Sequence, residues 1–207
     1  MKQKSLGIKN NLICIVIALV VFAIVTCYVM YFPNSRTYDL EMLKTVQGFL
    51  AFYPVGLAGA VSHFGASKFL FWPQFTAFCT VISHKKYAHA IGLVVFGQLA
   101  ILCINVLKNF FCRERPCGLA HPGFSYPSGH ALFTTCFYGM VIYLILHYVR
   151  NKFWKYFLAT LIVIYYVLVI TARMRLNVHF ATDLLAGFCV GFILLNLYII
   201  SMKFFNE

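Results

Sequence analysis

A set of polar residues at regular spacings stands out in an otherwise apolar chain. They form three short patterns: Lys108, six residues, then Arg115 and Pro116; Pro127-Ser128-Gly129-His130; and Arg173, five residues, His179, three residues, Asp183. Cations can bind an anion, and histidines with a carboxylate partner can transfer a group or a proton from it. These patterns therefore define a candidate site.

The three cations indicate a bound phosphate group. Any one of Lys108, Arg115 and Arg173 could instead extend from the rim of a membrane span to the lipid headgroups. Three cations at one depth repel one another unless an anion lies among them, and guanidinium groups match phosphate oxygens in pairs. We therefore expect these three side chains to hold phosphate oxygens.

The two histidines and the aspartate predict covalent catalysis. His179 and Asp183 are four positions apart at the start of a predicted helix, so the carboxylate can hold one imidazole nitrogen as a donor. The other nitrogen is then a free nucleophile, which predicts a phosphohistidine intermediate. His130, on the facing helix, is expected to protonate the departing oxygen. The alternative is a buried His-Asp contact that braces two helices.

The segment Pro127-Ser128-Gly129-His130 is typical of a helix start. Ser128 can cap the helix through its hydroxyl, and the first turn then presents free backbone N–H groups. Such groups attract anions. We therefore expect Ser128 and Gly129 to bind phosphate, although a helix start without a ligand would have the same sequence.

The composition indicates an integral membrane protein. Of 207 residues, 62% are hydrophobic and 11% are charged, and the mean hydropathy is +0.83. A soluble domain of this size could not bury so much apolar surface. The net charge of +12 comes from short basic clusters between apolar runs rather than from a nucleic-acid-binding module. Nucleic acid is therefore not an expected partner.

Hydropathy predicts an all-α, six-helix membrane bundle that forms one domain over residues 1–207. The expected spans are 12–32, 67–83, 88–110, 131–149, 157–171 and 180–200. Residues 39–63 are expected to lie on the membrane face or to form a re-entrant segment between the first two spans. The basic clusters Lys2–Lys9, His84–Lys86 and Arg150–Lys155 predict that both termini are cytoplasmic. All three patterns then meet at the extracytoplasmic face, which in a bacterial inner membrane is the periplasmic face.

The eight cysteines are scattered, without paired Cys-x-x-Cys spacing, so neither a zinc site nor a disulfide scaffold is indicated. Cys112 and Cys117 flank Arg115 in a predicted external loop, where a disulfide between them is one alternative. No metal or other cofactor is expected.

Together, the three patterns resemble the three-part signature of the type 2 phosphatidic acid phosphatase superfamily. The resemblance covers residues 108–183 directly, and the six-span layout extends it to most of the chain. It implies metal-independent hydrolysis of a phosphomonoester or diphosphate of a membrane lipid, with His179 as nucleophile, Asp183 as its partner and His130 as acid. It also supports Ser128 and Gly129 as phosphate ligands.

This chain departs from the family pattern at two positions. Ala172 stands where a serine commonly precedes the arginine, so one hydroxyl donor to phosphate is missing, and Cys117 stands where a basic residue often follows Arg-Pro. The substrate is left open among phosphatidic acid, phosphatidylglycerophosphate, undecaprenyl diphosphate and lipid A phosphates. A phosphotransferase that passes phosphate to an acceptor lipid, and a non-catalytic lipid-binding protein, are the alternatives. The oligomeric state is left open.

Overall fold

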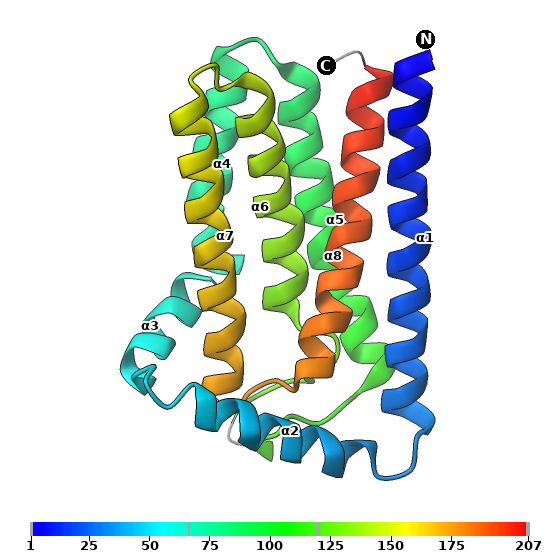
Figure 1. Cartoon of the computed structure of the whole chain (residues 1–207), viewed down its shortest axis with the longest axis vertical. Coiled ribbons are helices and arrows are strands. Elements are labelled where there is room, and N and C mark those ends of the chain that lie inside the picture. The colour runs from blue at the N-terminus through cyan, green and yellow to red at the C-terminus, as the bar shows by residue number, and fades with distance from the viewer. Residues whose placement is uncertain (1, 66, 119–120, 206–207) are drawn as a thin grey trace.

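The computed structural model describes residues 2–65, 67–118 and 121–205, and these residues form an all-helical bundle (Figure 1). The helices are α1 (Lys2–Tyr31), α2 (Ser35–Phe49), α3 (Val55–Phe64), α4 (Ser67–Ser83), α5 (Tyr87–Phe111), α6 (Gly129–Tyr148), α7 (Lys152–Arg175) and α8 (Ala181–Phe204). The described residues include no strand. The all-α prediction is therefore confirmed.

Five of the described helices are long and apolar enough to cross a membrane. They comprise Gly7–Tyr31 of α1 together with α5, α6, α7 and α8. The expected second span coincides with α4, but α4 has 17 residues, contains Pro73 and is not among the five. The sixth crossing therefore stays a prediction. The expected fifth span, 157–171, was too short, because α7 continues to Arg175 and carries Arg173 in its last turn.

The bundle is built around α6 and α8. Half of the α6 span is buried, compared with 6% of the α1 span, so α6 is central and α1 presents most of its surface outward. Gly187 and Gly191 of α8 meet the α6 backbone so closely that an added Cβ would lie 2.4 Å from the carbonyl oxygens of Ser128 and Leu132. Small residues at such contacts let two membrane helices approach. The start of α6 is thereby fixed against the start of α8.

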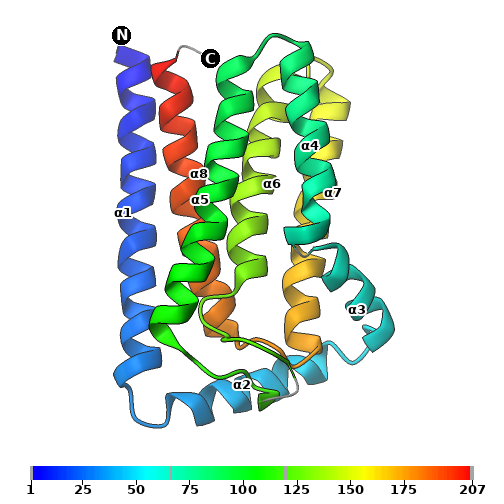
Figure 2. The same cartoon turned by 180° about the vertical axis from the view of Figure 1, so that it is seen from behind.

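The chain termini lie at one end of the bundle, and α2 lies across the other end (Figures 1 and 2). The buried face of α2 carries Ser35, Asp39 and Leu43 at helical spacing, so that this face packs on the bundle. α3 packs against α7 near the same end. The expected segment 39–63 is thus largely helical and covers the end at which α5, α7 and the connections to α6 and α8 meet.

Candidate active site

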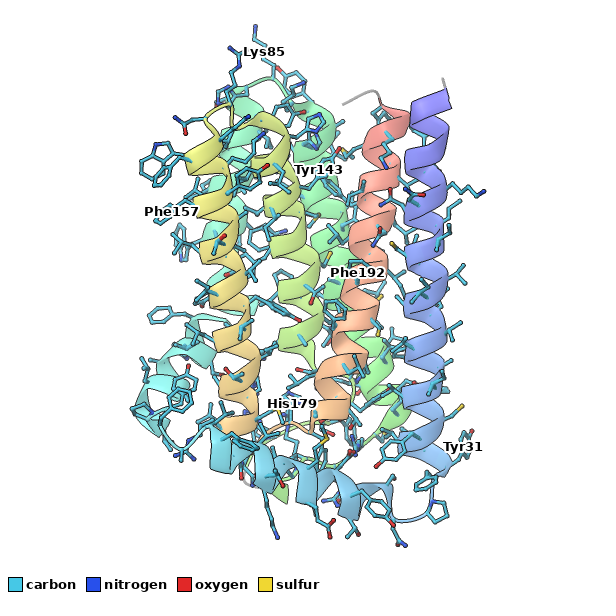
Figure 3. All side chains as sticks on the ribbon, viewed as in Figure 1. Tyr31, Lys85, Tyr143, Phe157, His179 and Phe192 are labelled. Carbon is cyan, nitrogen blue, oxygen red and sulfur yellow. The ribbon has the colours of Figure 1, made fainter. Side chains whose placement is uncertain are left out.

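A cavity of about 370 Å³ lies at the end of the bundle opposite the termini. Figure 3 labels His179 at this end and Lys85 at the other. The cavity is lined by Gly59, Ser62, His63, Lys108, Arg115, His121, Gly129, His130, Arg173 and His179. Six of the eight predicted site residues are in this lining, although they come from separate parts of the chain. Tertiary packing therefore brings the three sequence patterns together.

Lys108 and Arg115 reach the cavity from the end of α5 and the loop after it. The Lys108 Nζ donates to the carbonyl oxygen of Phe124. Arg115 is 7% exposed; its Nε donates to Gly123 O at 3.0 Å and its Nη1 donates to Val178 O at 2.9 Å. These bonds join the loop before α6 to the connection before α8. Arg115 is thus held from two sides, and Lys108 is held by the loop before α6.

Arg173 has an unsatisfied donor in the cavity wall. Its side chain is buried, and its Nη1 donates to the Ser62 hydroxyl oxygen. Its Nε has no hydrogen-bond partner among the described residues. A buried donor without a partner costs about 1–3 kcal/mol. An anion in the cavity would supply the missing acceptor.

His179 and Asp183 form the expected pair. The His179 Nδ1 lies 3.3 Å from Asp183 Oδ2, and the same oxygen accepts from the backbone N–H of Phe180 at 3.0 Å. On its other side, His179 Nε2 lies 3.2 Å from Nη1 of Arg115. Because a guanidinium can only donate, Nε2 must accept, and the imidazole proton therefore lies on Nδ1, toward Asp183. The Nε2 lone pair faces the cations that line the cavity.

The electrostatic surroundings keep His179 neutral. Burial, followed by the charges of Arg173, Lys108 and Arg115, holds the pKa of His179 well below its usual range. A neutral imidazole is the nucleophilic form. The cations that would attract an anion therefore also favour the unprotonated form of His179 at neutral pH.

Arg113 is part of this network, although it belongs to none of the three sequence patterns. Its Nη1 donates to Asp183 Oδ1 at 2.7 Å, and its Nη2 is paired with Asp39 of α2. Thr182 Oγ1 also donates to that Asp39 carboxylate at 2.8 Å, and the guanidinium lies 4.2 Å from the ring centroid of Phe180. As a basic neighbour outside the spacing pattern, Arg113 carried no special signal. Only the fold brings it to Asp183.

His130 is in the cavity wall at the start of α6. Its Nε2 lies 3.1 Å from the carbonyl oxygen of Ser62, which belongs to the last turn of α3. A carbonyl can only accept, so Nε2 carries a proton. His130 therefore presents its Nε2–H on the side of the ring that faces α3.

Ser128 and Gly129 have different surroundings. Gly129 lines the cavity, as expected. Ser128 is fully buried and is not among the lining residues: its Oγ caps α6 by accepting from Ala131 N at 3.4 Å, and its N–H donates to Asp183 O at 2.9 Å. The helix-capping expectation for Ser128 is confirmed, and its backbone N–H is engaged with Asp183 in this structure.

The cavity includes residues that the sequence did not single out. Gly59, Ser62 and His63 come from α3, and His121 comes from the loop before α6. Burial, reinforced by the charges of Arg115, Arg173 and Lys108, lowers the pKa of His121 despite its bond to Pro122 O. None of these four residues belongs to a spaced pattern. The three residues of α3 reach the cavity because α3 packs against α7, and His121 reaches it because of the path of the loop before α6.

The structure also shows the surroundings of Ala172 and the state of Cys112 and Cys117. Ala172 packs with Tyr53 and Ala58 in a small buried cluster against α3. Cys112 and Cys117 are both free thiols in the structure, so the disulfide alternative is not realised. Within the described part of the chain, no group of three or more His, Cys, Asp or Glu residues gathers as a metal site would require.

Comparison with known proteins gives a consistent result. A model of the PAP2 superfamily matches residues 87–207. Phosphatidylglycerophosphatase B of Bacillus subtilis (strain 168) is 34% identical over 142 residues, which cover 65% of this chain and 68% of that protein. Undecaprenyl-diphosphatase of Sulfolobus acidocaldarius is 26% identical over 186 residues, which cover 84% of each chain.

The fold is also similar to a solved structure. The crystal structure of a transmembrane PAP2-type phosphatidylglycerolphosphate phosphatase from Bacillus subtilis aligns with a TM-score of 0.74 and 24% identity, covering 91% of this chain and 94% of that one. The likeness in fold thus extends across most of the chain, whereas the region matched by the family model begins at α5.

Proposed function

Because the chain belongs to the PAP2 superfamily, we propose that it hydrolyses a phosphomonoester or diphosphate of a membrane lipid through a phosphohistidine on His179. The observation that carries this proposal is the position of the His179 Nε2 lone pair, which faces a cavity lined by Lys108, Arg115 and Arg173. A neutral nucleophile beside three cations suits attack on a phosphate group.

The proposed reaction has two steps. The Nε2 of His179 attacks phosphorus, a P–N bond forms, and the bond between phosphorus and the leaving oxygen breaks. His130 acts in its imidazolium form, which the bound phosphate anion favours: it gives its Nε2 proton to that oxygen and keeps the proton on Nδ1, while Asp183 stabilises the cationic ring of His179. In the second step, water attacks the phosphohistidine: a P–O bond forms, the P–N bond to His179 breaks, and His130 takes a proton from the water as inorganic phosphate is released.

Lys108, Arg115 and Arg173 are proposed to hold the non-bridging oxygens, with the unsatisfied Nε of Arg173 as one of the donors. The Gly129 backbone at the α6 N-terminus is proposed to add a donor, and Ser128 is proposed to support this turn. Since Lys108, Arg115 and Arg173 supply the positive charge, we propose that the reaction needs no metal ion. If the hydroxyl of an acceptor lipid replaces water, the same intermediate gives a phosphotransferase, the alternative function.

Phosphate release from lipids tests this proposal. The purified protein in detergent with EDTA should release phosphate from phosphatidylglycerophosphate, undecaprenyl diphosphate, phosphatidic acid or lipid A. The first two are chosen because the similar proteins are named for them. His179→Ala should abolish release, whereas Lys44→Ala, an exposed cation on α2, should not. Activity lost with EDTA, or kept in His179→Ala, would contradict the mechanism.

We also propose that the cavity faces the extracytoplasmic side of the cell membrane and that both termini are cytoplasmic. Lys85 and the termini lie at the end of the bundle away from His179, which supports this orientation because basic clusters favour the cytoplasmic side. Topology reporters fused after α8 and inserted in the loop after α5 should report opposite sides. A cytoplasmic signal from the loop reporter would refute the orientation.

A further inference from the structure

Helix α3 closes one side of the cavity and contributes a buried serine to it. Ser62 is 4% exposed, is in the last turn of the helix, and is among the lining residues. It contacts both Arg173 on α7 and His130 on α6. One residue outside the three spaced patterns therefore touches a predicted phosphate ligand and the predicted acid.

The Ser62 hydroxyl has a hydrogen left to donate. The guanidinium of Arg173 can only donate, so in their contact the Ser62 Oγ accepts. Within the described ranges, this is the one hydrogen bond of the hydroxyl. Its own hydrogen is therefore available to an acceptor in the cavity, beside the unsatisfied Nε of Arg173. Two free donors, one neutral and one charged, thus lie together on this wall.

The backbone carbonyl of Ser62 makes a separate contact, with His130. The last four carbonyl groups of a helix lack an intrahelical partner, and the Ser62 carbonyl belongs to this set because α3 ends at Phe64. It accepts from His130 Nε2 at 3.1 Å. The backbone of α3 thus holds the imidazole of His130 with its proton at the cavity wall.

We propose that Ser62 is a further ligand of the substrate phosphate: its hydroxyl donates to a non-bridging oxygen that Arg173 also holds, and its carbonyl orients His130. This inference relies on the proposed function for the identity of the anion. When substrate enters, the phosphate oxygen accepts from the hydroxyl, and the leaving oxygen replaces the carbonyl as the acceptor for His130. Helix α3 therefore belongs to the binding site rather than only to its cover.

Binding of inorganic phosphate tests the role of the hydroxyl without requiring turnover. The full chain in detergent would be titrated with phosphate, and the rise in its unfolding temperature would give the dissociation constant. Ser62→Ala keeps the carbonyl and removes the hydroxyl, so we expect affinity to fall by about tenfold or more, the typical effect of losing a hydrogen bond to a charged group. Ser62→Thr keeps the hydroxyl and should retain most of the affinity.

Thr171→Ala is the matched control. Thr171 is two positions from Arg173, but its hydroxyl bonds to carbonyl groups of its own helix; phosphate affinity should be unchanged. If Ser62 only braces α3 against α7, Ser62→Ala would lower the unfolding temperature without phosphate and leave the affinity at the wild-type value. That result would overturn the inference alone. Equal, negligible phosphate binding by wild type and Arg173→Ala would overturn the proposed function as well.

Discussion

Arg113 Nη1 lies 2.7 Å from Asp183 Oδ1, so the carboxylate that contacts the candidate nucleophile is itself held by a guanidinium from the loop after α5. The other end of the guanidinium is paired with Asp39 of α2. All three side chains are at least nine-tenths buried. A helix lying across the end of the bundle is thereby linked to His179 through two ion pairs.

We expect Arg113→Gln to destabilise the protein and lower kcat. The substitution leaves two buried carboxylates without their cation, and breaking a buried pair in this way typically costs about 3–5 kcal/mol. Arg36→Gln is the control, because Arg36 pairs with Glu114 at 3.4 Å on the exposed surface, where an ion pair contributes about 1 kcal/mol or less. Thermal unfolding and kcat of both variants are the measurements. Equal effects at the two arginines would contradict the buried network.

Replacing His179 and replacing His130 should affect turnover differently when the leaving group of the substrate changes. His179→Ala should abolish turnover of every substrate, since no phosphohistidine can form. His130→Ala should reduce lipid hydrolysis strongly but retain more activity toward an aryl phosphate, whose leaving group departs without a proton. Acid-quench trapping with labelled substrate should find the label on His179. Label on another residue, or equal losses on both substrates in His130→Ala, would exclude this division of labour.

The pH profile should follow the neutral form of His179. Burial and the neighbouring cations hold the pKa of His179 well below its ordinary value of 6.5. Attack needs the unprotonated ring, so kcat/KM should be lost only as the pH falls below 6.5. Lys108→Gln removes a charge that lowers this pKa, and the acid limb of its weaker activity should move to higher pH. Lys44→Gln should leave the limb in place. An unmoved limb in Lys108→Gln would contradict the assignment.

Packing of α8 on α6 should be intolerant of a single methyl group at Gly187. An added Cβ would lie 2.4 Å from Ser128 O, so the two helices must separate next to Gly129 and Asp183. Overpacking of this kind typically costs about 1–3 kcal/mol, and we expect Gly187→Ala to lower both the unfolding temperature and kcat. Gly48→Ala in α2, where an added Cβ meets nothing within 4 Å, is the control. Similar stability of the two variants would show that the contact can relax.

Much of the fold could be predicted because its signals are local. Membrane insertion depends on the hydropathy of each run, and the expected ranges 88–110 and 131–149 differ from α5 and α6 by at most two residues at either end. The ends of α7 were missed because Lys152, Lys155, Arg173 and Arg175 lower the hydropathy of residues that are nevertheless helical. The segment before α4 was assigned to the membrane face, but hydropathy gave no indication of where α2 and α3 would pack.

The sequence by itself determined which residues are candidates for the chemistry: the spacing of His179 and Asp183, the helix start at Ser128 and the spacings that single out Lys108, Arg115 and Arg173 are properties of short stretches. Tertiary structure decided which other residues complete the site. Asp39, Ser62 and Arg113 lie outside the spaced patterns, and their partners are distant in sequence, so no local pattern marks them. They reach the site because buried polar groups must find partners, and only the packing of α2 and α3 on the end of the bundle determines which partners are within reach.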